Sequence, residues 1–192
     1  MLIKIKSKDT GFTLLEVIAA IFILTVGIGG SFALIQQTIS TASMIQSRLI
    51  AAYLGQEGIE IIRNIRDNNW LEQRESFQSP PEPDWNKGMS GCQGPINCCE
   101  GDYKTKMSPS KTPLTSLVGC DFNSLNYLNI DSDGFYSYLP GTPTKFKRKI
   151  LIDPIEDNKI KVAVIIQWEE KSKIYEIEVV EHITNWYEEH RQ

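Results

Sequence analysis

Histidine is nearly absent from this chain of 192 residues, which holds only His182 and His190, both close to its C-terminal end. That scarcity leaves little material for histidine-based acid–base chemistry or metal binding. The sequence also lacks a nucleophile paired with a base, a glycine-rich phosphate loop and a set of metal ligands at standard spacing. We therefore expect neither an enzyme nor a bound cofactor.

Basic charge is in short supply as well. Twenty Lys and Arg residues stand against 24 Asp and Glu residues, so the formal net charge is −4 and the pI is about 5.3. Proteins that bind nucleic acid through its phosphates concentrate Lys and Arg in one stripe, and none is visible here. We expect no nucleic-acid partner.

Charge is missing almost entirely from one segment, because Glu16 is the only formally charged residue between Asp9 and Arg48. Within it an apolar run extends from Phe12 to Ile35, which as a helix would measure roughly 36 Å at about 1.5 Å per residue. A hydrocarbon core is about 30 Å thick, so this run can span a membrane. The lysines before it favour a cytoplasmic N-terminus: Lys4, Lys6 and Lys8.

Proline is absent between Phe12 and Asn69, so no residue there forces a helix to stop. Beyond Ile35, apolar residues recur at steps of three and four, which is typical of one face of an amphipathic helix. The spacing predicts a single helix from about Phe12 to Arg66, roughly 80 Å long. Its predicted apolar face comprises Ile35, Ile39, Ala42, Ile45, Leu49, Ala52, Ile59, Ile62 and Ile65.

Glu16 lies four residues into the apolar run, where an unpaired carboxylate deep in lipid costs on the order of 3 kcal/mol. Position alone leaves two explanations open. Either the side chain reaches the headgroups at the cytoplasmic edge, or it meets a positive partner when helices assemble.

The string Gly11-Phe12-Thr13-Leu14-Leu15-Glu16-Val17 follows a short basic leader and opens the apolar helix. It strongly resembles the class III signal of type IV prepilins and pseudopilins, in which an inner-membrane prepilin peptidase cuts after the glycine and methylates the new N-terminus. The resemblance implies cleavage between Gly11 and Phe12 and N-methylation of Phe12. It also implies an assembly role for Glu16, whose carboxylate would pair with the Phe12 ammonium of a neighbouring subunit.

A second and less specific likeness lies further along the helix. The segments 51–60 and 63–67 resemble the helix end of minor pilins of the pilus-modification class. Here Gly55 and Gly58 would let a sheet approach the helix closely. The two likenesses imply a minor pilin or pseudopilin, a structural subunit of a type IV pilus or a type II secretion pseudopilus. Its implied partners are the prepilin peptidase and other pilin subunits, bound through the N-terminal helix.

The implied precursor is a single-pass inner-membrane protein with its globular domain outside the cytoplasm, and it reaches a cell-surface pilus or pseudopilus after assembly. We expect a leader at residues 1–11, a transmembrane and assembly helix at 12–35, an amphipathic continuation at 36–67 and an extracytoplasmic domain at 68–192. The alternative is an uncleaved, membrane-anchored binding module of the adhesin type.

The four cysteines lie in or just after a polar, irregular stretch that we expect to be a long surface loop, from Asn68 to about Thr112. In an exported domain they predict two disulfides. A bridge between the adjacent Cys98 and Cys99 would be strained. Cys92 therefore pairs with one of these two and Cys120 with the other, and both connectivities remain open.

The C-terminal part of the chain alternates apolar and polar residues with a period of two, which predicts strands. We expect three antiparallel strands around Phe146–Ile152, Ile160–Trp168 and Tyr175–Val179, with a turn at Glu169–Lys173. Packed on the C-terminal half of the helix, they give an α+β fold in which a long N-terminal helix, membrane-spanning and then amphipathic, lies on a small antiparallel sheet.

Asp131 and Asp133 stand one residue apart just before Gly134. A tight loop with such carboxylates is a weak candidate for calcium, although the downstream acidic ligand of an EF-hand is missing. A hairpin turn formed by Asp-Gly explains the string equally well.

Overall fold

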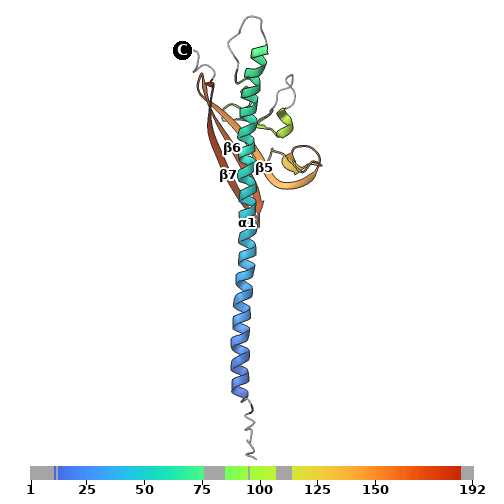
Figure 1. The fold of residues 1–192 in the computed structure, drawn as a ribbon, viewed down its shortest axis with the longest axis vertical. Coiled ribbons are helices and arrows are strands. Elements are labelled where there is room, and N and C mark those ends of the chain that lie inside the picture. Colours follow the sequence, from blue (N-terminus) through green and yellow to red (C-terminus); the bar gives the residue numbers. More distant parts are fainter. Residues whose placement is uncertain (1–10, 12, 76–84, 95, 107–113, 187–192) are drawn as a thin grey trace, which may run out of the picture. The chain divides into compact units, whose positions relative to one another are not determined.

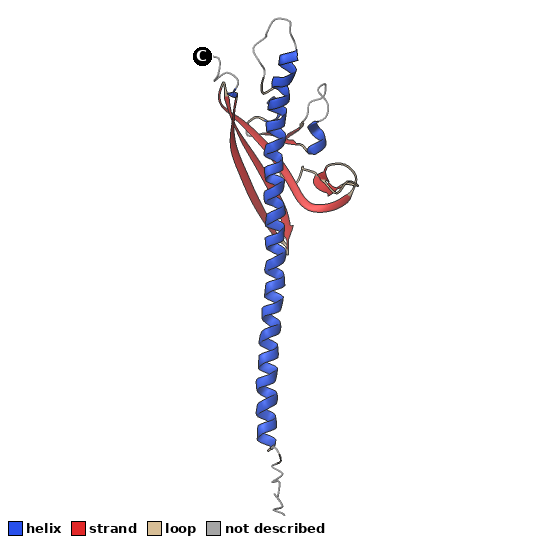
Figure 2. Cartoon of the chain, in the orientation of Figure 1, coloured by secondary structure: helices blue, strands red, loops and turns tan. Residues whose placement is uncertain are grey.

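The computed structural model describes residue 11 and residues 13–75, 85–94, 96–106 and 114–186. The chain divides into two compact units, Met1–Gln46 and Ser47–Gln192. The helix α1 (Leu14–Glu75) contributes to both units (Figures 1 and 2). It is long and apolar enough to cross a membrane.

The helix α1 ends at Glu75, nine residues beyond the predicted end at Arg66. Tertiary contacts stabilise the added turns, because Trp70 is buried and its Nε1 donates a hydrogen bond to Asn185 Oδ1 at 3.1 Å. Asn69 Nδ2 also donates to the carbonyl of Trp85 at 3.0 Å. Asn68–Glu75 is therefore helical, and the prediction that the loop starts at Asn68 was wrong.

In the described residues of the second unit, seven strands form one sheet. The three strands that were predicted are present and longer than expected: β5 (Thr142–Glu156), β6 (Lys159–Glu170) and β7 (Lys173–Thr184). Four short strands join them on the other side of β5: β1 (Asn97–Glu100), β2 (Thr115–Val118), β3 (Tyr127–Ile130) and β4 (Tyr136–Ser137). All pairings between these strands are antiparallel.

The hairpin between β6 and β7 is tighter than predicted. Its turn is only Lys171 and Ser172, which adopt positive φ angles of 52° and 60°. Two central residues with positive φ are the mark of a turn whose twist matches that of the flanking strands. The 12 residues of β6 and the 12 of β7 consequently pair along their whole length.

The core of the second unit lies between α1 and the β5–β7 part of the sheet (Figure 1). Gly55 and Gly58 face the strands, as predicted, since a Cβ on them would lie 2.6 Å from Val179 Cγ2 and 2.7 Å from Val164 Cγ1. This close approach decides which side of α1 is buried. The predicted face was partly wrong, because Leu49 is exposed, whereas the buried apolar side chains include Ala51, Leu54, Ile59, Ile61, Ile62 and Ile65.

Candidate functional site

The candidate processing and assembly site is the start of α1. Gly11 is exposed, and among the described residues beyond its chain neighbours no atom lies within 4 Å of the position where its Cβ would be. The described residues therefore give no steric reason for a glycine at this position. Phe12, the other residue of the predicted cleavage bond, lies outside the described residues.

Thr13 caps the N-terminus of α1, a role that was not predicted from the sequence. The backbone N–H of Glu16 donates to the Thr13 carbonyl at 3.1 Å and to Thr13 Oγ1 at 3.4 Å. The spacing Thr-x-x-Glu is that of a capping box, and it was visible in the sequence. Glu16 also lies in the first turn, where the helix dipole favours a negative charge. Glu16 thus contributes to starting its own helix.

The apolar side chains that follow are exposed along the first unit. In the most apolar stretch of α1, none of the residues is buried within the chain. Leu14 and Leu15 are each 80% exposed, and the same pattern continues through Ile35 and Ile39. An apolar surface of this extent is typical of helices that lie in lipid or pack against other proteins.

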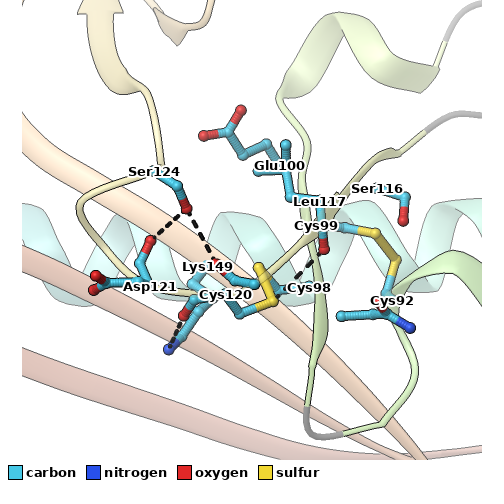
Figure 3. The surroundings of a disulfide bond; sticks show 12 residues. Cys92, Cys98, Cys99, Glu100, Ser116, Leu117, Cys120, Asp121, Ser124 and Lys149 are labelled. Atoms are coloured by element: carbon cyan, nitrogen blue, oxygen red, sulfur yellow. Dashed lines mark hydrogen bonds between the residues drawn. A yellow bond between two sulfur atoms is a disulfide. The ribbon is translucent and has the colours of Figure 1, made fainter.

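The two disulfides follow from the alternation of side chains along β1. Cys99 pairs in register with Ile150 and joins Cys92 on the side that faces the core, with a Cα–Cα distance of 5.2 Å. Because adjacent residues of a strand point to opposite faces, Cys98 points the other way. It joins Cys120 with a Cα–Cα distance of 5.6 Å (Figure 3). The structure thereby selects one of the two open connectivities.

The segment after Cys120 is fastened by polar contacts. The Glu100 carboxylate accepts hydrogen bonds from Asn126 N at 2.6 Å and from Asn126 Nδ2 at 2.9 Å. Lys149 Nζ donates to the Cys120 carbonyl at 3.4 Å, as Figure 3 shows. Further along, Lys147 Nζ donates to the Phe122 carbonyl at 2.7 Å. The Cys98–Cys120 disulfide and these contacts hold the segment against β5.

Asp131 organises the hairpin between β3 and β4. Its Oδ1 accepts hydrogen bonds from the backbone N–H groups of Asp133 and Phe135, and its Oδ2 accepts one from the Tyr103 hydroxyl at 2.6 Å. The Tyr103 bond, helped by these N–H groups and by the Lys104 ammonium, lowers the pKa of Asp131 to about 2.

The contacts at this turn bear directly on the calcium candidate. Lys104 Nζ lies 3.4 Å from Asp131 Oδ2 and 3.7 Å from Asp133 Oδ2, so a protein ammonium occupies the space between the two carboxylates. Gly134, with φ of +85°, completes the Asp-Gly turn by donating to the Asp131 carbonyl. Within the described ranges, no group of three or more His, Cys, Asp and Glu side chains is placed to hold a metal ion.

Arg148 is fully buried between the helix and the sheet. Its Nη1 donates to the Leu54 carbonyl and to Glu57 Oε2, both at 3.1 Å, and its Nη2 donates to the Gly101 carbonyl. One guanidinium therefore ties α1 to β5 and to the end of β1. The signal was present in the sequence, since Arg148 lies between Phe146 and Ile150 on the apolar face of the predicted strand. Arg148 was nevertheless not predicted to be a buried residue.

Comparison with known proteins identifies the N-terminal segment. Residues 6–32 match the model of the prokaryotic N-terminal methylation motif. Searches of curated proteins and of solved structures each found no match to the chain. The matched range contains Gly11, Thr13 and Glu16 and is followed by the remainder of the long helix. The chain therefore carries the N-terminal signature of the type IV pilins.

Proposed function

We propose that this protein is a minor pilin or pseudopilin, a structural subunit of a type IV pilus or a type II secretion pseudopilus. In this proposal prepilin peptidase cleaves the chain between Gly11 and Phe12 and methylates Phe12. The subunit then enters the fibre through its N-terminal helix. The observation that carries the proposal is the methylation motif at residues 6–32, which opens a helix whose apolar side chains are exposed.

The exposed apolar helix suits two successive environments. In the precursor, lipid covers the side chains from Leu14 to Ile35. After extraction, the same side chains pack against the helices of neighbouring subunits. These helices replace the lipid, so the side chains keep an apolar environment. No catalytic chemistry is required of the subunit.

Glu16 would meet a new positive partner after processing. Cleavage at Gly11 frees an ammonium on Phe12, and this ammonium in one subunit can neutralise Glu16 of the next. A carboxylate in an apolar surrounding is stable only when it is paired, so the pair would fix the axial register of each incoming subunit.

The disulfides support an orientation for the precursor. Both bridges, Cys92–Cys99 and Cys98–Cys120, belong to the second unit. Such bonds persist in oxidising compartments, and the lysines of the leader favour the cytoplasm. We therefore place the second unit outside the inner membrane and the leader inside it.

The capping role of Thr13 allows a sharp test of Glu16. Glu16→Gln keeps the size and the capping geometry but removes the charge, whereas Thr13→Ala removes the capping hydroxyl and keeps the charge. We expect Glu16→Gln to reduce incorporation of the processed protein into the sheared fibre fraction by at least about tenfold, a pairing loss of more than about 1.4 kcal/mol. Thr13→Ala should assemble nearly as the wild type does.

Both variants must be compared with wild type for leader removal and for the two disulfides, so that only assembly is scored. If the processed Glu16→Gln protein enters the fibre as efficiently as wild type, the charge-pair mechanism is contradicted. Loss of incorporation in Thr13→Ala to the same extent would show that starting the helix, and not the charge, is what matters at Glu16.

A further inference from the structure

The sheet face opposite α1, which we call the outer face, carries its charges in separate columns. The registers of β5, β6 and β7 define four rows across it: Lys147–Gln167–Glu176, Lys149–Ile165–Glu178, Leu151–Ala163–Val180 and Asp153–Lys161–His182. These rows point away from the helix, because α1 contacts the alternate residues Val164 and Val179.

A basic column lies on β5 and an acidic column on β7. Strands are about 4.8 Å apart, so the backbones of the two columns are separated by roughly 10 Å. Among the described residues, no ion pair joins Lys147 or Lys149 to Glu176 or Glu178. Next to the charged rows lies an apolar patch formed by Leu151, Ile165 and Val180, in which Ala163 is already buried within the chain. Gln167 Nε2 donates to Glu176 Oε1 at 2.6 Å, which leaves the other carboxylate oxygen of Glu176 as a further acceptor.

The two lysines of the basic column are held in place. Lys147 Nζ lies 4.4 Å from the ring centre of Tyr127, and Lys149 Nζ lies 4.5 Å from that of Phe122. Each ammonium also donates one bond to a carbonyl of the segment fastened by Cys98–Cys120. Since an ammonium has three donors, each lysine retains the capacity to bind a carboxylate without giving up its present contacts.

We propose that two copies of this chain pair through their outer faces about a twofold axis that runs along β6. Rotation about that axis preserves the order of the rows and exchanges the columns. Lys147 and Lys149 of one copy then lie over Glu176 and Glu178 of the second copy, and the reverse holds at the other side. Ile165 meets its own counterpart, and Leu151 meets Val180 of the second copy, which gives an isologous contact with an apolar patch beside the charged rows.

The fourth row contributes least to this pairing. It sets Asp153 against His182 of the second copy, but it also brings Lys161 towards its own counterpart. The observation that favours a second copy over other occupants is that it satisfies both columns at once. An acidic ligand would match only the basic column and leave Glu176 and Glu178 unpaired.

The size of the face predicts a weak contact. Three strands and four rows cover about 400 Å² per copy, roughly half of the 800 Å² per partner typical of stable complexes. Tethering to one membrane raises the effective concentration and favours such a contact. A twofold contact closes on itself and does not propagate along a fibre, so it belongs to the membrane-bound chain. It requires neither cleavage nor assembly and goes beyond the proposed function.

The first test uses the full chain in its membrane, with the photoreactive residue p-benzoylphenylalanine in place of Val180. The predicted geometry sets Val180 opposite Leu151 of the second copy. We expect a cross-linked dimer whose fused peptides join β7 to β5. Dimers joined only elsewhere, or cross-links only to lipid or to another protein, would overturn the proposal.

The second test reverses the columns separately. Lys147→Glu with Lys149→Glu makes the face acidic, and Glu176→Lys with Glu178→Lys makes it basic. Like charges then oppose each other, so each variant alone should give at least about tenfold less dimer cross-linked from Val180. Expressed together, the two variants should restore a mixed dimer, because opposite columns meet again.

The control reverses the same number of charges beyond the four rows of the outer face, with Glu156→Lys and Asp157→Lys at the turn between β5 and β6, and it should leave the yield unchanged. Intact mass verifies both disulfides in every variant. The pair Glu176→Lys and Glu178→Lys spares the lysines that hold the Cys120 segment, so it remains informative if the lysine variant misfolds. Undiminished dimer in that variant, or no mixed dimer from two folded variants, would contradict the pairing.

Discussion

Single residues in this chain carry roles that depend on what surrounds them. Arg148 is fully buried and interacts with Glu57 and two backbone carbonyls. If one partner of a buried ion pair is removed, the remaining charge stays buried without a counter-charge. The loss in folding stability is then larger than the stability that the intact pair contributes. Lys145, on the same strand, reaches the edge of the core and contacts Ser47 and Glu170. Arg148 and Lys145, two basic residues of the same strand, therefore differ in what they contact and in how deeply they are buried.

Asp131 gives a pH dependence at the residue scale. Its pKa of about 2 lies below the ordinary value of about 3.9, so the folded state favours the ionised carboxylate. This stabilisation is present above about pH 4 and is lost as the pH falls from about 4 to about 2. We expect the difference in free energy of unfolding between wild type and Asp131→Asn to be constant above pH 5 and to shrink below pH 4.

Denaturant unfolding of the full chain in detergent, followed by tryptophan fluorescence, measures that difference at each pH. Tyr103→Phe is the matched variant, because it removes the largest cause of the lowered pKa while leaving the carboxylate in place. The pH dependence of its free energy of unfolding should lie between that of wild type and that of Asp131→Asn. A difference between wild type and Asp131→Asn that does not change with pH would contradict the assignment.

At the scale of elements, the contact between α1 and the sheet depends on two glycines. A Cβ at Gly58 would lie 2.7 Å from Val164 Cγ1, so Gly58→Ala must push the helix away from β6. Although alanine favours a helix by about 1 kcal/mol over glycine, we expect a net destabilisation of about 1–3 kcal/mol from overpacking.

The cause of that effect can be isolated with a double variant. Val164→Ala removes the methyl groups that Gly58→Ala would meet, so the two changes together should cost less than the sum of each alone. Denaturant unfolding of the four proteins gives the coupling energy. Additive costs, or a Gly58→Ala chain as stable as wild type, would show that the close approach does not matter.

The elements that sequence patterns predicted are the long ones. In α1 and in β5–β7 the apolar residues recur with one period over many residues, so a few exceptions to the pattern do not change the predicted element. The strands β1–β4 have two to four residues and show no period. β1 and β3 pair with β5, whereas β2 pairs with β1 and β4 pairs with β3. Two disulfides also hold β1. The cysteine connectivity followed only once Cys98 and Cys99 were known to lie on a strand with Cys99 facing the core.

At the N-terminus, the motif could be predicted from consecutive residues alone, and the match at residues 6–32 identifies it independently. The cleavage bond and the roles of Phe12 and Glu16 stay predictions. The capping bond from Glu16 N–H to Thr13 was also local, and only its significance was overlooked. The outer face, by contrast, depends on registers between three strands, which no local pattern reveals.

For the whole molecule, the decisive question is whether the bond after Gly11 is cut. A processed chain has a free N-terminus at the head of an apolar helix and is ready for assembly. An uncut chain keeps the leader and uses the same helix as a permanent anchor. The two states differ at a single peptide bond and lead to different functions.

Intact mass and N-terminal sequencing of the protein from membranes, in cells with and without prepilin peptidase, test this most directly. We predict a chain that begins at methylated Phe12 when the peptidase is present and at Met1 when it is absent. A start at Met1 in both strains would contradict the pilin proposal. The protein would then be an anchored binding module outside the membrane.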